Sequence, residues 1–477
     1  MNKYVKSAAI LLLILILISL ATKYYGSTDV EEYESTAKYF SGDYNAKLRV
    51  SHSILYGIIN YPLVSLFHSF FIMKITGLIF LILIAISVYY ISKKNKKSLF
   101  LLILSPIFWY LAPWISPIQL TSLLFLWAYF FIDKYDKKQE IKYLIYSGLL
   151  TGLATAFWNT IIFPAFFLII CFFYKRNVNH LILFLIAGFI GYLPAFSIDI
   201  FFYKFPFYNM IKYLLGIFTA VTQGSIYSGI IRASSSILPI LLFLLMIPFF
   251  SFKIFKKQFF TRNKRTIFFL IFTFLFFLKN PQIRYILLFV PILVLLLPKV
   301  LSKKQFRIQI VIFIILTLLV INPYLIQIKY PTNAKDFSSL ITNTGKWNIL
   351  ENENQLILED LKEISKQYPN QVFVVGNKPE DYVSLALIYW NKDIKEFVSI
   401  EDYSLQENPV LFEKTIKSNP TIADRRQILI TGKLQKSDTD KTDYDLIKLG
   451  IGLKEPIKLD NFKEIKKYNV LYLSEKA

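Results

Sequence analysis

The apolar residues of this chain occur in long blocks, and no other feature limits its fold as strongly. A helix needs about 20 mostly apolar residues to cross a bilayer, whereas the helices of a soluble core alternate apolar and polar faces. The sequence is 55% hydrophobic and only 18% charged. The blocks predict about eleven membrane-spanning helices. Their expected positions are roughly 5–23, 70–92, 98–113, 118–132, 143–157, 160–174, 181–199, 236–252, 266–278, 285–299 and 308–326.

The loops between these blocks alternate in charge. Every second loop carries clustered lysine and arginine residues, at 93–97, 134–142, 175–176, 253–265 and 299–307. The loops at 113–117 and 158–159 are short and lack such clusters. By the positive-inside rule the basic loops are cytoplasmic, which predicts a cytoplasmic N-terminus and an extracytoplasmic C-terminus. This distribution explains the net charge of +22 without nucleic-acid binding, and we expect no nucleic-acid partner.

The segment 1–21 has the charge pattern of a signal peptide but no clear cleavage site, so we expect an uncleaved first span.

Three segments outside the span pattern fall on the predicted outer side. The first is the outer loop 24–69, whose apolar part 54–67 is too short to cross the membrane and is expected to lie along the interface. A second outer loop is expected at 201–235. The third segment begins at about residue 329.

The C-terminal region has a different composition, with frequent charges and short strand patterns. Strands are predicted at Gln371–Gly376, Gln427–Gly432 and Tyr468–Leu473, with helices at 354–367 and 379–389. The alternation indicates a small soluble α/β domain with a mainly parallel sheet. The sequence therefore predicts an all-α membrane domain at 1–328 and an extracytoplasmic domain at 329–477. Cys171 is the only cysteine, so no disulfide bond within the chain is expected.

Acidic residues cluster directly after the first span, at Asp29, Glu31 and Glu32. Carboxylates crowded beside a bilayer are costly unless they are solvated, paired or used in chemistry. A plain structural explanation is that Asp29 caps a solvated acidic helix. A chemical explanation is that these carboxylates act on a substrate at the membrane surface.

This arrangement resembles the type-C (GT-C) glycosyltransferases, multi-span enzymes that use sugars carried on polyprenyl phosphates. Residues 28–43 are similar to the first outer loop of mannosyltransferase-type members, where acidic residues precede a helix and a glycine turn. Residues 52–56 and Tyr61-Pro62 stand where members carry basic and Tyr-Pro residues. Residues 279–285, followed by Pro291, resemble the entry to a late span of the same superfamily.

The resemblance implies a GT-C-like helix bundle and a role for each matching residue. Asp29 would be the general base, while Glu31 and Glu32 would orient the acceptor, tune the base or hold a divalent cation. The candidate ligands for the donor phosphate are Lys279 and Arg284, with Arg49 and His52 as weaker candidates. The candidate cavity-lining residues are Tyr56, Trp158, Asn159, Gln282 and Tyr285.

Ordinary structural roles compete with these assignments. Arg284 and Lys279 stand at span ends, where basic side chains commonly reach the interface, and Trp158 is placed as an interfacial anchor. Asp199 ends a span on the predicted outer side and is expected to be solvated. The sequence also departs from the family, because Phe157-Trp158-Asn159 replaces an arginine that several members carry after the fifth span.

The predicted function is transfer of a sugar from a polyprenyl-phosphate donor to a glycan, lipid or protein acceptor outside the cytoplasm. The protein would be a multi-pass cell-membrane enzyme that inverts the configuration of the sugar. The resemblance leaves the need for a divalent cation open, and no metal ligands are assigned. Three alternatives remain, namely a lipid-linked glycan flippase or transporter, a polysaccharide polymerase, and a membrane-anchored scaffold or receptor.

Overall fold

The computed structural model describes most of the N-terminal two thirds of the chain and scattered parts of the remainder. The described residues are 3–22, 33, 36–37, 40, 54–67, 71–173, 178–211, 213–214, 233–251, 253, 256–279, 283–329, 360, 363–364, 366–367, 372–376, 397–399, 427–432, 462–468 and 471–476.

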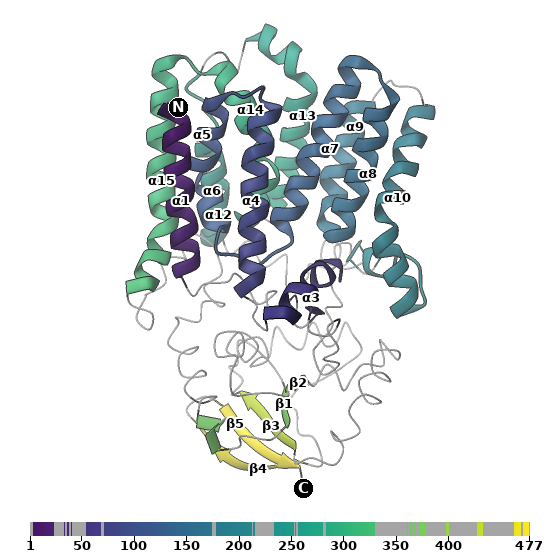
Figure 1. The fold of residues 1–477 in the computed structure, drawn as a ribbon, viewed down its shortest axis with the longest axis vertical. Coiled ribbons are helices and arrows are strands. Elements are labelled where there is room, and N and C mark those ends of the chain that lie inside the picture. The colour runs from purple at the N-terminus through teal and green to yellow at the C-terminus, as the bar shows by residue number, and fades with distance from the viewer. Residues whose placement is uncertain are drawn as a thin grey trace.

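Helices make up the N-terminal part, and most of them run side by side in one bundle (Figure 1). The α-helices are α1 (Lys3–Ala21), α3 (Leu55–Phe67), α4 (Phe71–Ile91), α5 (Lys96–Leu104), α6 (Pro106–Leu111), α7 (Ile118–Lys138), α8 (Ile141–Phe157), α9 (Ile162–Phe173), α10 (Val178–Tyr203), α12 (Ala233–Met246), α13 (Lys257–Lys279), α14 (Val290–Val300) and α15 (Lys303–Lys329). Two 3-10 helices, η1 (Asn159–Ile161) and η3 (Ile283–Leu288), join neighbouring helices. The predicted helical bundle is confirmed.

The two ends of the bundle differ in what they carry. The N-terminus and the basic turns, such as those between α4 and α5 and between α7 and α8, lie at one end, called here the basic end (Figure 1). At the opposite end, called the sheet end, α1, α8 and α10 finish, and a β-sheet lies beyond it. Helix α3 lies across the sheet end rather than along the bundle, as expected for a segment at the interface.

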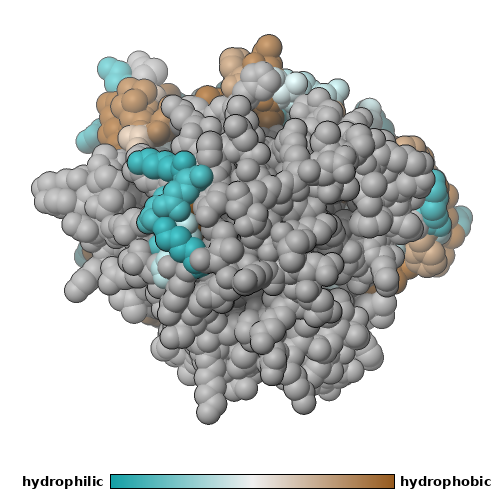
Figure 2. Space-filling model, turned by 90° about the horizontal axis from the view of Figure 1, so that it is seen from below, coloured by the Kyte–Doolittle hydropathy of each residue, from teal (hydrophilic) through white to brown (hydrophobic). Residues whose placement is uncertain are grey.

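Within the described part of the chain, four helices are both long and apolar enough to cross a membrane. They are Lys3–Ala21, Ile72–Ile91, Val178–Phe201 and Lys303–Ile321. Large apolar side chains such as Phe189 on α10 and Leu318 on α15 are exposed. In a view from below, hydrophobic surface lies at the rim of the molecule (Figure 2). Exposed apolar helix surface suits contact with lipid, while the count of about eleven spans stays a prediction.

Two predicted spans are each divided into two helical pieces, and proline explains both divisions. The span predicted at 98–113 is α5 and α6, separated at Ser105, because the residue before a proline disfavours the helical conformation and Pro106 follows. The carbonyl groups released at this break are satisfied by side chains. Trp109 Nε1 donates to Ile103 O at 2.8 Å, and Thr317 Oγ1 of α15 donates to Leu104 O at 2.7 Å.

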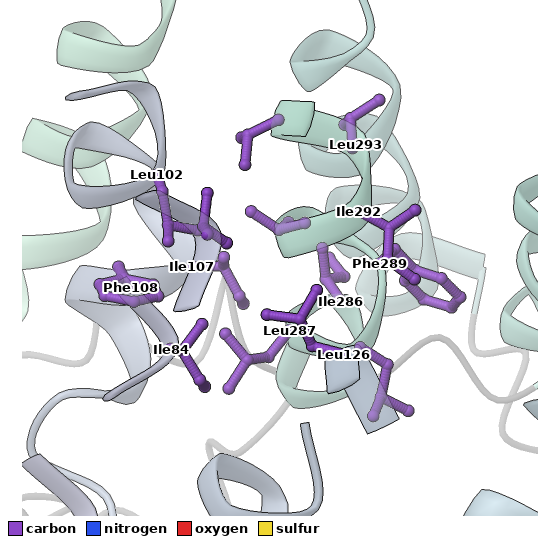
Figure 3. Close-up of a cluster of buried hydrophobic side chains, with 14 of the residues drawn as sticks. Ile84, Leu102, Ile107, Phe108, Leu126, Ile286, Leu287, Phe289, Ile292 and Leu293 are labelled. Carbon is purple, nitrogen blue, oxygen red and sulfur yellow. The ribbon is translucent and has the colours of Figure 1, made fainter. Parts of the chain in front are cut away.

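The span predicted at 285–299 is likewise divided, into η3 and α14. Proline occupies the first turn of α14, where its missing N–H group costs nothing. Both divided spans contribute to one hydrophobic core, which brings together α4, α5, α6, α7, η3 and α14 (Figure 3). Phe108, Ile286 and Phe289 are buried in this core.

Helices α8 and α10 pack closely through glycines. A β-carbon at Gly152 would overlap the carbonyl oxygen of Gly188, and one at Gly191 would overlap that of Leu149. Small residues that let two backbones approach are the usual basis of helix packing in membranes. This contact holds the sheet-end terminus of α10 beside that of α8.

The C-terminal part contains a five-stranded sheet in the order β2-β1-β3-β5-β4. Its strands are β1 (Val372–Gly376), β2 (Phe397–Ser399), β3 (Gln427–Gly432), β4 (Phe462–Lys467) and β5 (Leu471–Lys476). Strand β1 pairs in parallel with β2 and β3, while β5 pairs antiparallel with β3 and β4. The sheet is therefore mixed, and the prediction of a mainly parallel sheet holds for only half of it.

Strand β4 was not predicted from the sequence, because most of its residues are charged. Its sequence, Phe-Lys-Glu-Ile-Lys-Lys, has few apolar residues, and it lies at an edge of the sheet, where lysines discourage further strand pairing. The predicted helix at 379–389 lies outside the described residues. Of the one predicted at 354–367, residues 360, 363–364 and 366–367 are described and are helical.

Candidate functional site

Most of the predicted site residues lie outside the described part of the chain. Those whose side chains the structure describes are Tyr56, Trp158, Asn159, Arg284 and Tyr285. Those outside it are Asp29, Glu31, Glu32, Arg49, His52 and Gln282, as well as the side chain of Lys279 at the end of α13. Their assigned roles therefore remain predictions.

The segment that follows the acidic residues is held against α3 at the sheet end. Tyr33, which directly follows Glu32 in the sequence, is buried, and its ring lies 5.1 Å from the ring of Tyr56 in an edge-to-face contact. Such aromatic pairs stabilise a contact beyond the area they bury. Gly57 lets this segment approach, because a β-carbon there would overlap the side chain of Thr36. Tyr33 and Thr36 therefore have fixed positions at the sheet end.

Tyr56 is fully buried in this contact. Burial raises the pKa of its hydroxyl above the ordinary value, and the neighbouring Tyr33 adds to the increase. Tyr56 therefore remains neutral at physiological pH and acts as a packing group. It belongs to a small hydrophobic cluster that also includes Phe157 at the end of α8 and Tyr192 of α10.

Lys74, near the start of α4, is a residue that the sequence analysis missed. Its side chain has 0% exposure, and its Nζ atom donates a hydrogen bond to Thr22 O at 2.8 Å. Lysine is rarely buried unless its charge has partners. Thr22 follows α1 directly, so Lys74 lies beside the point where the chain enters the acidic loop. The signal was present in the sequence as a single lysine inside an apolar block.

The other half of the sheet end is formed by the turn after α8 and by η3. The ring of Trp158 is buried and lies 5.2 Å from the ring of Tyr285. The guanidinium group of Arg284 lies 5.6 Å from the centre of the same Tyr285 ring. Four of the predicted site residues are therefore brought together, because Asn159 follows Trp158. They adjoin the Tyr56 cluster through Phe157, the residue before Trp158.

Tyr213 is also part of this half of the site. Its hydroxyl donates a hydrogen bond to Thr160 Oγ1 at 2.9 Å. Burial raises the pKa of this hydroxyl, and the nearby Tyr285 raises it further, while the Thr160 hydrogen bond and the charge of Arg284 lower it. Tyr213 stays neutral at physiological pH and fixes the turn that carries Asn159 and Thr160.

Asp199 does not have the solvated environment that was expected. It is 1% exposed, and its Oδ1 atom accepts a hydrogen bond from Asn209 Nδ2 at 2.6 Å. Asn159 Nδ2 in turn donates to the main-chain oxygen of Asn209 at 3.3 Å. The expectation failed because Asn159, forty residues before Asp199 in the sequence, covers this helix end only in the folded chain. Among the described residues, no group of three or more His, Cys, Asp or Glu side chains forms a metal site.

The comparisons with known proteins bear on the fold. No family model matches the sequence, and no curated protein matches it. The structure is similar to the crystal structure of ArnT from Cupriavidus metallidurans in the apo state, with a TM-score of 0.55 and 11% sequence identity. The match covers 99% of this chain and 97% of that chain. ArnT is a GT-C family polyprenyl-phosphate-sugar glycosyltransferase. The likeness shows that this chain shares the fold of that structure, and its long apolar helices suit a protein that crosses the membrane several times.

Proposed function

We propose that this protein is an integral membrane glycosyltransferase that moves a sugar from a polyprenyl-phosphate donor to an acceptor outside the cytoplasm. The fold supports a GT-C membrane glycosyltransferase in general. The acceptor is a lipid, a glycan or a protein. The sheet end of the bundle would face the outside, because the basic turns lie at the opposite end.

The observation that carries this proposal is the packing of Tyr33, the residue after Glu32 in the sequence, at the end of the bundle that also holds Lys74 and Arg284. Tyr33 is buried against Tyr56, and the Tyr56 cluster extends through Phe157 to the turn that contacts Tyr285. We infer that the carboxylates that precede Tyr33 in the sequence lie at the same end of the bundle as Lys74 and Arg284. Transfer from a sugar phosphate needs both kinds of group.

The proposed reaction is a single displacement with inversion. An acceptor hydroxyl or amine attacks the anomeric carbon as the bond from that carbon to the phosphate oxygen breaks. Asp29 takes the proton of the attacking group, and the electrons of the broken bond leave with the polyprenyl phosphate. Arg284, Lys279 and Lys74 stabilise the departing phosphate, with Arg49 and His52 as further candidates. Glu31 and Glu32 orient the acceptor, tune Asp29 or hold a divalent cation.

The arrangement fits a transferase better than a transporter. A transporter of charged lipids is expected to place ionisable groups near the middle of the membrane, often in broken helices of paired repeats. Among the described helices, the buried ionisable residues Lys74 and Asp199 lie near helix ends at the sheet end. Charges at one surface suit chemistry at that surface.

The test is transfer of radiolabelled sugar from a polyprenyl-phosphate donor in membranes that contain the full chain. Asp29→Asn should lower the rate about 100-fold or more, because the general base is lost while the side-chain shape remains. The matched control is Asp133→Asn, which changes an aspartate at the basic end that pairs with Lys137. Equal rates for Asp29→Asn and the unchanged chain would remove Asp29 as the base.

The sidedness is tested by labelling single cysteines from outside intact cells. Replacing Cys171 by serine gives a cysteine-free background, because the sequence has no other cysteine. Ser27→Cys and Gln282→Cys should both react with a membrane-impermeant maleimide, while Asn95→Cys should be protected. Labelling of residues 27 and 282 from opposite sides would contradict the proposed site.

A further inference from the structure

Asp199, Asn209 and Asn159 form a buried polar group at the sheet end, called here the Asp199 cluster. Their side chains are 1%, 5% and 1% exposed, respectively. They come from the end of α10, the segment after it and the start of η1. Hydrogen bonds connect them, from Asn209 Nδ2 to Asp199 Oδ1 and from Asn159 Nδ2 to the main-chain oxygen of Asn209. The main-chain N–H of Asn209 also interacts with the Asp199 carboxylate.

Several oxygen atoms of this cluster accept no hydrogen bond from the part of the chain that the structure describes. They are Asp199 Oδ2, Asn209 Oδ1 and Asn159 Oδ1, and the hydroxyl of Tyr192 is buried in the same way. Leaving a buried acceptor without a partner costs about 1–3 kcal/mol, and more for a charged one. Three such acceptors together indicate that something else satisfies them.

The hydrogen bonds show which atoms of the cluster are still available to a ligand. Each asparagine uses an N–H as a donor to its neighbour, so its amide oxygen remains for another contact. Carboxylate and amide oxygens accept hydrogen bonds or bind hard cations, and they repel anions.

We propose that the Asp199 cluster binds a hard cation of the Ca²⁺ class. Ca²⁺ takes oxygen ligands from carboxylates, amide carbonyls and water in flexible geometry, whereas Zn²⁺ prefers His and Cys. With a single carboxylate, the affinity belongs at the weak end of the range, with a Kd of about 10⁻⁴–10⁻³ M. Such a site would be filled at the millimolar calcium concentration typical outside cells.

The cation would add to the hydrogen bonds that already join these three segments, such as the one from Tyr213 to Thr160. One of these segments begins directly after Trp158, whose ring contacts Tyr285 beside Arg284. Binding would therefore fix the turn that supports the proposed phosphate ligands. The site itself is independent of the proposed transferase activity, because cation binding needs no turnover.

The test uses the purified full chain in detergent after treatment with EDTA. Tb³⁺ replaces Ca²⁺ at oxygen sites and emits light when a nearby Trp or Tyr transfers energy to it, and Trp158 and Tyr192 are nearby. The unchanged chain should give a saturable Tb³⁺ signal that CaCl₂ displaces, together with a Ca²⁺-dependent rise in Tm. Asp199→Asn should lose both effects, while Asp133→Asn and Asp29→Asn should keep them.

A gain-of-binding variant guards against a simple folding defect of Asp199→Asn. Asn159→Asp adds a second carboxylate to the cluster and should tighten Ca²⁺ binding about tenfold, because affinity follows the number of charged ligands. A signal lost in Asp29→Asn and kept in Asp199→Asn would place the cation at the acidic loop and overturn the proposal. Absence of any signal would mean that the cluster holds only ordered water, which would overturn it as well.

Discussion

The two ends of the helical bundle treat their charged groups differently. At the basic end, opposite charges meet near the surface, as Arg265 does with Asp136 and Lys142 with Glu140. The hydrogen bond from Lys142 holds the pKa of the Glu140 carboxyl below its ordinary value. At the sheet end, Lys74 and Asp199 are buried and hydrogen-bond to neutral groups.

This difference separates structural charge from functional charge. Exposed ion pairs contribute little to stability. Lysine and arginine residues in the turns of one end serve to orient a protein in the membrane. Buried charges cost free energy, and proteins commonly accept that cost at sites where a ligand completes the arrangement. We therefore expect substitutions at the two ends to have different consequences, and three of them test this expectation, in order of decreasing effect.

The largest effect should come from the helix pair that supports the sheet end. Gly152→Ala should lower the free energy of unfolding by about 3 kcal/mol, because its methyl group would overlap the Gly188 carbonyl, and overpacking is costly. Gly188→Ala is the matched control, since a β-carbon there would lie 3.6 Å from Gly148 O, an ordinary contact. Thermal unfolding followed by tryptophan fluorescence measures both. Equal melting temperatures for the two variants would mean that α8 and α10 do not pack as described.

An intermediate effect is expected at Lys74. Lys74→Met keeps the length of the side chain but removes its charge and the hydrogen bond to Thr22 O, so the free energy of unfolding should fall by about 1–3 kcal/mol. Transfer activity should fall about 100-fold, equivalent to about 2.7 kcal/mol, if the charge stabilises the leaving phosphate. Activity and Tm are measured on the same preparation. A variant that loses stability but keeps its rate would show that Lys74 is structural.

The smallest effect should come from the basic end. Asp136→Asn removes the partner of Arg265, and both side chains are partly exposed. The loss of stability should be below about 1 kcal/mol, and sugar transfer should be unchanged. If Asp136→Asn lowered the rate of sugar transfer as far as Lys74→Met does, the expected difference between the basic end and the sheet end would be contradicted.

The sequence predicted the arrangement of helices well, because run length and loop charge act locally. The 17-residue helix Ile141–Phe157 was predicted almost residue by residue, and α3 was separated from the spans by its length and by Asn60 and Pro62. The break at Ser105 was missed although Pro106 signals it, because the apolar block continues through it.

The site was less predictable, because burial depends on segments distant in the sequence. Arg284 and Tyr285 were chosen from a family resemblance, whereas Trp158 and Asn159 were chosen from their place in a short loop. The structure brings these residues together. Asp199 was expected to be solvated because nothing local indicates that Asn209 and Asn159 cover it. The roles of the acidic residues, the sidedness and the number of spans stay predictions.

The proline break between α5 and α6 has a consequence for how the protein is made. An unsatisfied carbonyl group in hydrocarbon costs several kcal/mol, and the one at Leu104 is satisfied by Thr317, which is synthesised more than two hundred residues later. An early segment of the chain must therefore reach the bilayer with a polar defect that only a very late helix repairs. Translocation machinery or a chaperone would have to shelter this segment until α15 emerges from the ribosome.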